Sequence, residues 1–107
     1  MKIAVTSNRE GADQPVEERF GRCAVLAIFD TDSGALSFVP NQAKDANSGA
    51  GTKAAQQLID LGVEVLITGK VGPGALEVLN EGDIRVETWT SGTVGEAVRR
   101  FGSKGAT

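Results

Sequence analysis

The chain has no histidine and no tyrosine, and it has a single cysteine among its 107 residues. Histidine and tyrosine are common proton-transfer groups, so their absence argues against an acid–base enzyme. One cysteine cannot form an internal disulfide, which excludes a small scaffold held together by disulfide bonds. One thiolate also cannot complete a zinc or iron–sulfur site alone, because such sites need about four ligands. These absences favour a binding protein over an enzyme.

Long apolar runs and an excess of positive charge are missing as well. The first residues are apolar over a short stretch only, which predicts a strand rather than a signal peptide or a membrane helix. The net charge of −3 argues against a nucleic-acid surface. With 40% hydrophobic and 23% charged residues, we expect one cytoplasmic domain over residues 1–107, with a frayed tail at 102–107 and neither nucleic-acid nor membrane partners.

Apolar periodicity predicts five strands and three helices. The strands are expected at residues 2–6, 23–30, 35–40, 63–68 and 84–89, and the helices at 49–61, 73–80 and from a cap at 93 to about 101. Pro73 suits a first helical position, Gly62 suits a helix end, and Thr93 with Glu96 forms a capping box. The order is that of an α/β fold, with a hairpin first and parallel strands joined by right-handed crossovers after it.

This topology brings the loops 7–22, 41–48, 69–72 and 90–92 to one edge of the sheet, which we call the rim. The three expected helix N-termini face the rim and offer unpaired N–H groups, as ligand sites of open α/β sheets do. The basic residues expected on the rim are Arg9, Arg19, Arg22, Lys44, Lys53 and Lys70. Two-metal nuclease chemistry is rejected, because the first strand lacks carboxylates at this edge.

The segment Arg19-Phe20-Gly21-Arg22-Cys23 joins a soft ligand to two anion-binding side chains. Arg19 and Arg22 could lower the pKa of the Cys23 thiol and so favour the thiolate. A lone cysteine before an apolar strand is equally well interpreted as a small buried hydrophobic residue. Both interpretations stay open at this point.

Two glycine-rich segments, 48–53 and 68–74, precede or open helices. Small residues there let a ligand approach the backbone, but neither segment has the spacing of a phosphate-binding P-loop or a dinucleotide fingerprint. An ordinary helix start explains the first about as well as an anion site does, and close packing of strand against helix explains the second somewhat better than ligand contact does. Trp89 is expected to be a half-buried core aromatic rather than a ligand-stacking platform.

Five motifs stand in a familiar order. They are Met1-Lys2-Ile3-Ala4-Val5, Arg19-Phe20-Gly21-Arg22-Cys23, Ser48-Gly49-Ala50-Gly51, Thr68-Gly69-Lys70-Val71-Gly72-Pro73 and Ser91-Gly92-Thr93-Val94. In this order the chain resembles, over nearly its whole length, the dinitrogenase iron–molybdenum cofactor biosynthesis family. That family includes NifX-like carriers and the small orange protein, which carries a molybdenum–copper sulfide cluster.

The resemblance implies a ribonuclease H-like, three-layer α/β fold with a five-stranded mixed sheet of order 3-2-1-4-5, in which strand 2 is antiparallel. It also implies non-catalytic, non-covalent binding of an anionic metal–sulfur cluster of iron–sulfur, iron–molybdenum or molybdenum–copper sulfide type. The implied partners are the proteins that donate and accept the cluster, and we expect a monomer or a weak dimer.

Many members have a histidine where Arg19 stands, and some have histidines ahead of Gly49, so histidine ligation is impossible here. We therefore expect Arg19, Arg22 and Lys70 to supply charge and Cys23 to be the single metal ligand. The other expected cluster contacts are Ser7, Asn8, Gly49, Ala50, Gly51, Gly72 and Gly92. The alternative is a regulatory or adaptor module that binds a phosphate-bearing small molecule or a protein, with Cys23 merely buried.

Overall fold

The structure is a computed structural model that describes residues 1–102. Its strands are β1 (Lys2–Ser7), β2 (Val25–Asp30), β3 (Leu36–Pro40), β4 (Val63–Thr68) and β5 (Arg85–Thr88). Its helices are α1 (Ala50–Asp60), α2 (Pro73–Glu81) and α3 (Val94–Gly102). The expected tail lies, apart from Gly102, outside the described residues.

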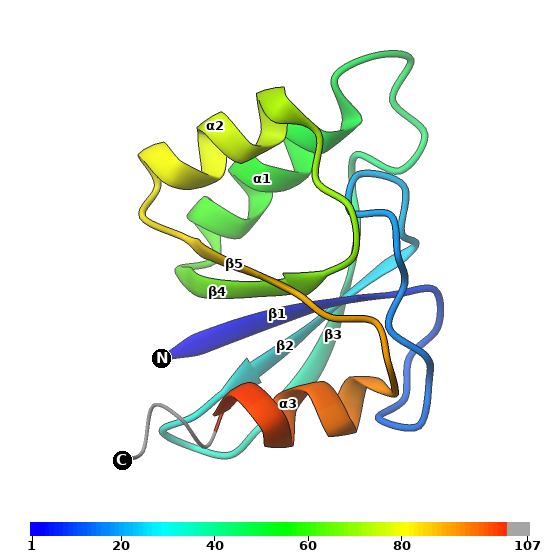
Figure 1. Cartoon of the computed structure of the whole chain (residues 1–107), viewed down its shortest axis with the longest axis vertical. Helices are drawn as coiled ribbons and strands as arrows, with labels where there is room; N and C mark the ends of the chain where they lie inside the picture. The colour runs from blue at the N-terminus through cyan, green and yellow to red at the C-terminus, as the bar shows by residue number, and fades with distance from the viewer. Residues whose placement is uncertain (103–107) are drawn as a thin grey trace.

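The five strands form one sheet of order β3-β2-β1-β4-β5, which confirms the predicted α/β topology. β2 runs antiparallel to β1 and β3 antiparallel to β2, whereas β1, β4 and β5 are parallel. In Figure 1 the helices α1 and α2 cover one face of this sheet and α3 covers the other. This layering is compatible with a ribonuclease H-like fold.

Each face of the sheet has its own apolar core. Leu26 and Leu66 point toward α1 and α2, while Val5 and Ile67 on the other face pack beneath α3. The alternation follows from the two-residue period of strands, which sends neighbouring side chains to opposite faces. Trp89 is half-buried and meets the Phe101 ring edge-on at 6.2 Å, as expected of a core aromatic. None of the helices within residues 1–102 combines the length and apolar character needed to cross a membrane.

Three strands are shorter than the sequence predicts: β3 starts at Leu36 rather than at residue 35, and β2 and β5 also start late. β2 starts at Val25 rather than at residue 23, because the Ala24 N–H donates to Asn8 Oδ1 at 3.2 Å instead of joining the ladder with β1. β5 starts at Arg85 rather than at residue 84, because the Ile84 N–H donates to Leu79 O at 2.9 Å and closes the end of α2. Local hydrogen bonds at the two junctions therefore set the starts of β2 and β5.

Residues 12–20 cross the rim, and we call them the strap. At one end the N–H groups of Val94 and Gly95 donate to strap carbonyls, both at 2.8 Å. At the other end the Lys70 N–H donates to Glu18 O at 2.6 Å and the Phe20 N–H donates to Lys70 O at 3.3 Å. Val16 and Phe20 anchor the strap because their side chains are buried. The strap thus holds together the loops that follow β4 and β5.

Candidate functional site

A pocket of about 350 Å³ opens at the rim, between the starts of α1 and α2. The strap end and the loop after β4 complete its wall. Its lining residues are Phe20, Gly21, Arg22, Gly49, Ala50, Gly51, Thr52, Lys70, Gly72, Gly74 and Ala75. The structure therefore brings together six residues of the predicted site, namely Arg22, Gly49, Ala50, Gly51, Lys70 and Gly72.

The start of α1 presents backbone donors to this pocket. Gly49 takes a left-handed conformation with φ of 68°, which glycine adopts without steric cost, and no described side chain caps the helix. The first helical hydrogen bond runs from the Lys53 N–H to Gly49 O at 3.0 Å, so the N–H groups of residues 50–52 have no partner within the helix. No acidic residue stands in this first turn, so nothing there offsets the positive end of the helix dipole.

The start of α2 has the same character. Its first helical bond runs from the Leu76 N–H to Gly72 O at 2.9 Å, which leaves the N–H groups of Gly74 and Ala75 without helical partners. Pro73 has no N–H to satisfy, and neither a capping side chain nor a first-turn acid is present among the described residues. Two positive helix ends therefore meet at one pocket, an arrangement that suits an anion.

Gly21 lets the strap end approach α1 closely. A Cβ at this position would lie 2.7 Å from the Gly51 nitrogen and 2.9 Å from its Cα, which is closer than side chains approach a backbone. The segment 20–22 can form a wall of the pocket only because residue 21 has no side chain.

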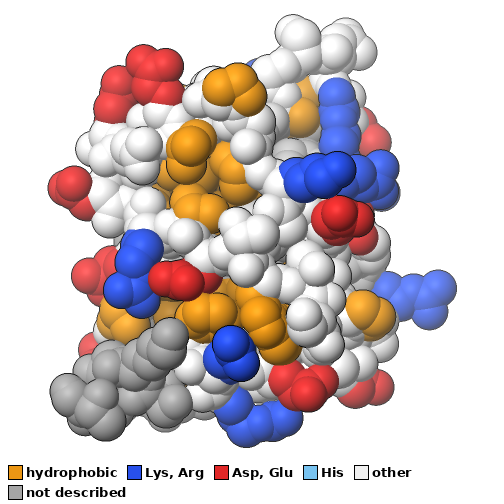
Figure 2. All heavy atoms as spheres, in the orientation of Figure 1, with side chains coloured by type: hydrophobic (Ala, Val, Ile, Leu, Met, Phe, Trp, Pro, Cys, Tyr) orange, Lys and Arg blue, Asp and Glu red, His pale blue; other side chains and the backbone are white. Residues whose placement is uncertain are grey.

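Two basic residues complete the pocket. Arg22 donates from Nη1 to the carbonyls of Lys44 and Ala46, both at 2.9 Å, and these bonds hold its guanidinium against the loop 41–48. Lys70 is exposed, and its backbone is fixed by the strap. Figure 2 shows Lys and Arg side chains gathered on the right-hand side of the molecule, where Figure 1 has α1 and α2 begin. The pocket is thus positive although the chain as a whole is acidic.

Cys23 does not lie in this pocket. Its side chain is fully buried in the core beneath α1 and α2, and its Sγ accepts a 3.7 Å hydrogen bond from Asn41 Nδ2. Burial raises the pKa of the thiol to about 11, despite hydrogen bonds from Asn41 and Ser7 that act in the opposite direction. The expectation that Arg19 and Arg22 lower this pKa is therefore wrong. The two guanidinium groups are bound elsewhere, and the thiol is protonated at neutral pH.

Three further predicted residues have other partners. Arg19 donates from Nε to Glu17 Oε1 at 2.9 Å, and Asn8 donates from Nδ2 to Glu17 Oε2 at 2.8 Å. Burial alone would raise the pKa of Glu17, but the hydrogen bonds from Arg19 and Asn8 outweigh it and hold this pKa below its usual value. Ser7 is buried and donates from Oγ to Arg9 O at 2.8 Å. Arg19 and Asn8 thus hold Glu17 near the end of the strap, Ser7 holds the loop after β1, and none of the three lines the pocket.

Gly92 precedes the start of α3, and the Glu96 carboxylate caps this helix start. The Thr93 N–H donates to Glu96 Oε1 at 3.0 Å, and the Glu96 N–H donates to Thr93 Oγ1 at 3.2 Å, which confirms the predicted capping box. Hydrogen bonds from Thr93 lower the pKa of Glu96, so the acid stays ionised at this helix end. An anion at Gly92 would meet this negative charge.

Five lining residues were not among the predicted site residues: Phe20 and Gly21 at the strap end, and Thr52, Gly74 and Ala75 at the helix starts. The last three could still have been found. They stand at the second or third helical position of α1 or α2, where the N–H of any residue lacks a helical acceptor. Their position relative to the helix start could have identified them, because the side-chain type is irrelevant to that role.

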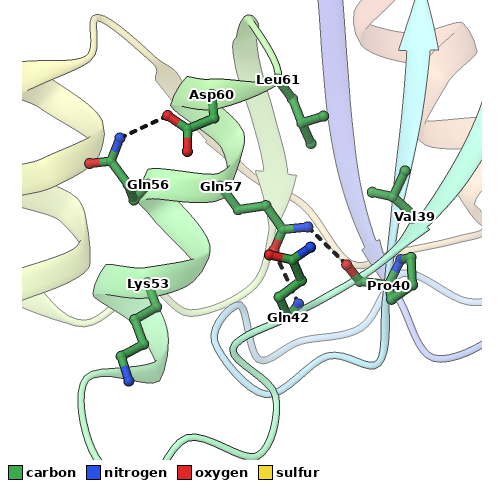
Figure 3. Close-up of a pocket in the computed structure, with 8 residues that line it drawn as sticks. All are labelled: Val39, Pro40, Gln42, Lys53, Gln56, Gln57, Asp60 and Leu61. Carbon is green, nitrogen blue, oxygen red and sulfur yellow. Dashed lines mark hydrogen bonds between the residues drawn. The ribbon is translucent and has the colours of Figure 1, made fainter.

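Another cavity, of about 570 Å³, is larger but lies away from these donors, between β3 and α1 (Figure 3). It shares no lining residue with the rim pocket and contains none of the predicted site residues. Backbone donors and two basic residues, rather than volume, make the rim pocket the candidate site.

The fold and the pocket together define a small α/β protein with a positively charged pocket between two helix starts at the rim. The chain belongs to the dinitrogenase iron–molybdenum cofactor family, whose model matches residues 1–104. This membership confirms the resemblance and connects the chain with the biosynthesis or binding of that cofactor.

Two solved structures are similar over nearly the whole chain. The apo form of the orange protein from Desulfovibrio gigas has a TM-score of 0.91 and 39% identity, covering 96% of this chain and 88% of that one. A Thermotoga protein described as a candidate NifB protein of the DUF35 family has a TM-score of 0.82 and 36% identity, covering 97% and 88%. An uncharacterised protein of Methanocaldococcus jannaschii is 27% identical over 106 residues, which is 94% of this chain and 85% of the relative.

Proposed function

We propose that the protein binds and carries a preassembled, anionic metal–sulfur cluster in the rim pocket and catalyses no reaction on it. The observation that carries this proposal is the pair of helix starts without a capping side chain, α1 and α2, whose first-turn residues line one pocket with Arg22 and Lys70. Family membership and the likeness to the orange protein support a cluster as the cargo.

The donor set suits a cluster that brings its own sulfides rather than a bare metal ion. Within residues 1–102 no group of three or more cysteine, aspartate or glutamate side chains is placed to hold a metal. Backbone N–H groups and cations instead bind negatively charged sulfur or oxygen atoms on the outside of a cluster. Iron–sulfur, iron–molybdenum and molybdenum–copper sulfide clusters all fit this description.

Cys23 as a metal ligand stays a prediction that this proposal does not use. Its thiol is buried and protonated, and a cluster in the pocket would reach it only after the core had opened. The proposal also leaves out four other predicted residues. Three of them hold the strap or the loop before it, and the fourth precedes α3: Arg19, Asn8, Ser7 and Gly92. The cluster would come from a donor protein and pass to an acceptor protein. The pocket is open to solvent at the rim, so a bound cluster could leave without a change in the fold.

The first experiment is metal and sulfide analysis, with a visible spectrum, of protein purified anaerobically from its native host. Stoichiometric metal with sulfide and charge-transfer bands supports the proposal and identifies the cluster. The matching titration adds iron with sulfide, or molybdate with copper and sulfide, to the metal-free protein. Protein that is metal-free as purified and takes up neither cluster contradicts the proposal.

Charge variants test the site itself. Lys70→Gln removes a cation from the pocket, and we expect cluster affinity to fall about tenfold, which equals ~1.4 kcal/mol. Lys44→Gln is the matched control, because the Lys44 side chain is exposed and does not line the pocket. Equal losses in the two variants would indicate a general effect of net charge rather than a site at the helix starts.

A phosphate-bearing small molecule is the second candidate cargo, because helix N-termini bind phosphate by the same donors. In that case phosphate or a nucleotide raises the melting temperature without any metal. Stabilisation by nucleotides together with failure to take up either cluster would favour the adaptor function.

A further inference from the structure

β3 forms an edge of the sheet, because β2 is its only hydrogen-bonded strand among the described residues. Two backbone hydrogen bonds show which of its backbone groups face outward. The Asp30 N–H donates to Ala35 O and the Asn41 N–H donates to Ala24 O, both at 3.0 Å. Residues 35, 37, 39 and 41 therefore bond to β2, and the residues between them direct their N–H and C=O groups away from it.

The outward set consists of Leu36, Phe38 and Pro40. Gln57 Nε2 donates to Pro40 O at 2.8 Å from the outer side, which agrees with this assignment. Pro40 has no N–H, so Gln57 and the proline close that end of the edge. The open part of the edge is two N–H and two C=O groups, on Leu36 and Phe38.

The open part lacks the usual protection of an edge strand. β3 has the sequence LSFVP and carries no charge, whereas edge strands commonly carry charged residues that discourage pairing. The opposite edge, β5, does so: Arg85 and Glu87 form an ion pair at 3.2 Å along it. Leu36 and Phe38 are only half-buried, on the face of the sheet covered by α3.

We propose that β3 pairs antiparallel with β3 of a second copy of this chain. With Ser37 on the two-fold axis, Leu36 of each copy stands opposite Phe38 of the other. Each strand supplies two N–H and two C=O groups, so the pair forms four hydrogen bonds and leaves none of these groups unpaired. The same register sets leucine against phenylalanine twice on one face, which is a favourable cross-strand contact.

The cavity beside β3 fits the same register. It lies between β3 and α1, and Figure 3 shows Val39 and Leu61 facing it at one end, with Lys53 and Gln42 at the other. Val39 stands opposite Ala35 of the second copy, whose small side chain enters the cavity. The turn that follows β2 in the second copy then lies beside Gln42, and it carries Asp32, whose side chain is 88% exposed and pairs with the Met1 amino group of its own copy at 3.2 Å. Lys53 and Asp60 both line the cavity, so its charge is balanced; the two matched Leu36–Phe38 pairs and the four backbone hydrogen bonds favour a second copy as the occupant.

Ser37→Lys tests the pairing. It places two lysines opposite each other on the axis, and we expect the dimer dissociation constant to rise at least tenfold because like charges oppose each other there. Ser37 is exposed, so the protomer keeps its fold. Thr88→Lys is the matched control, since it adds the same charge at an exposed position on the other edge strand. Far-UV circular dichroism and thermal melts verify the fold of both variants.

The measurements are sedimentation equilibrium and amide hydrogen exchange of the full chain from micromolar to millimolar concentration. We expect the mass of the wild type and of Thr88→Lys to rise toward the dimer, and the Leu36 and Phe38 amides to become protected as it does. A wild type that stays monomeric at millimolar concentration overturns the proposal. So does a Ser37→Lys variant that dimerises like the wild type, or protection that never reaches Leu36 and Phe38.

Discussion

At the scale of single residues, burial decides what Cys23 can do. The sequence places this cysteine between basic residues and an apolar strand, and both of its interpretations depend on which way the side chain points. The structure directs it into the core, where desolvation raises the pKa of the thiol to about 11. Arg22 meanwhile binds carbonyls of the loop 41–48. Neighbours in sequence thus differ completely in their surroundings.

The variant Cys23→Ala distinguishes between two roles of this residue, as a metal ligand and as a buried core residue. We expect the free energy of unfolding to fall by about 1–2 kcal/mol, because a buried sulfur and its contact with Asn41 are lost. Cluster affinity should change less than twofold, since the thiol does not reach the pocket. Urea unfolding and cluster titration measure the two effects. A stable variant that loses cluster affinity tenfold would restore Cys23 as a ligand.

At the scale of elements, the three helix starts show what could and could not be predicted. The capping box at Thr93 and Glu96 and the glycines at the other two starts are local patterns, so the sequence predicts them. The sequence cannot show that Glu96 closes the α3 start against anions while the α1 and α2 starts share one pocket. The strap is also hidden from the sequence, because Lys70 and Glu18 are joined through backbone atoms that every residue has.

The capping box makes stability depend on pH. The pKa of Glu96 and that of Glu17 are lowered by folding from the usual 4.5, so both carboxylates stabilise the fold above about pH 4.5. This contribution is lost as the pH falls through their folded-state pKa values. Glu96→Gln should therefore show a smaller drop in melting temperature between about pH 5 and pH 3 than the wild type. Glu77→Gln is the control, because it removes an exposed carboxylate from outside the capping box.

An equal pH dependence in Glu96→Gln and in the wild type would contradict this account. It would place the acid sensitivity in other carboxylates.

At the scale of the whole molecule, the cores and the pocket are separate. Two apolar cores on opposite faces of the sheet hold the elements together, and the pocket lies beyond the ends of the strands at the rim. The topology could be predicted because strand and helix alternation permits few arrangements. The pocket could be predicted only in part, because its wall requires the close approach of Gly21 to Gly51.

Removal of the cargo should leave the fold intact. We expect the metal-free protein to unfold cooperatively, with the far-UV circular dichroism of an α/β domain. A cluster that binds only the folded protein should raise the melting temperature. At a free cluster concentration a hundred times its dissociation constant, it should raise the free energy of unfolding by about 2.7 kcal/mol. Calorimetry with and without the cluster measures this. A metal-free protein without a cooperative transition would show that the cluster is part of the folded structure.

The strap has a consequence for the timing of protein synthesis. It joins residues near the start of the chain to Lys70 and, through the Val94 and Gly95 amides, to the start of the last helix. A ribosome that has released only the first strands and α1 exposes one wall of the pocket without its counterpart. Contacts between such distant residues form late, because the intervening chain must first be ordered. On the proposed function, a donor protein would therefore meet a complete pocket only after residues 70–75 had left the ribosome.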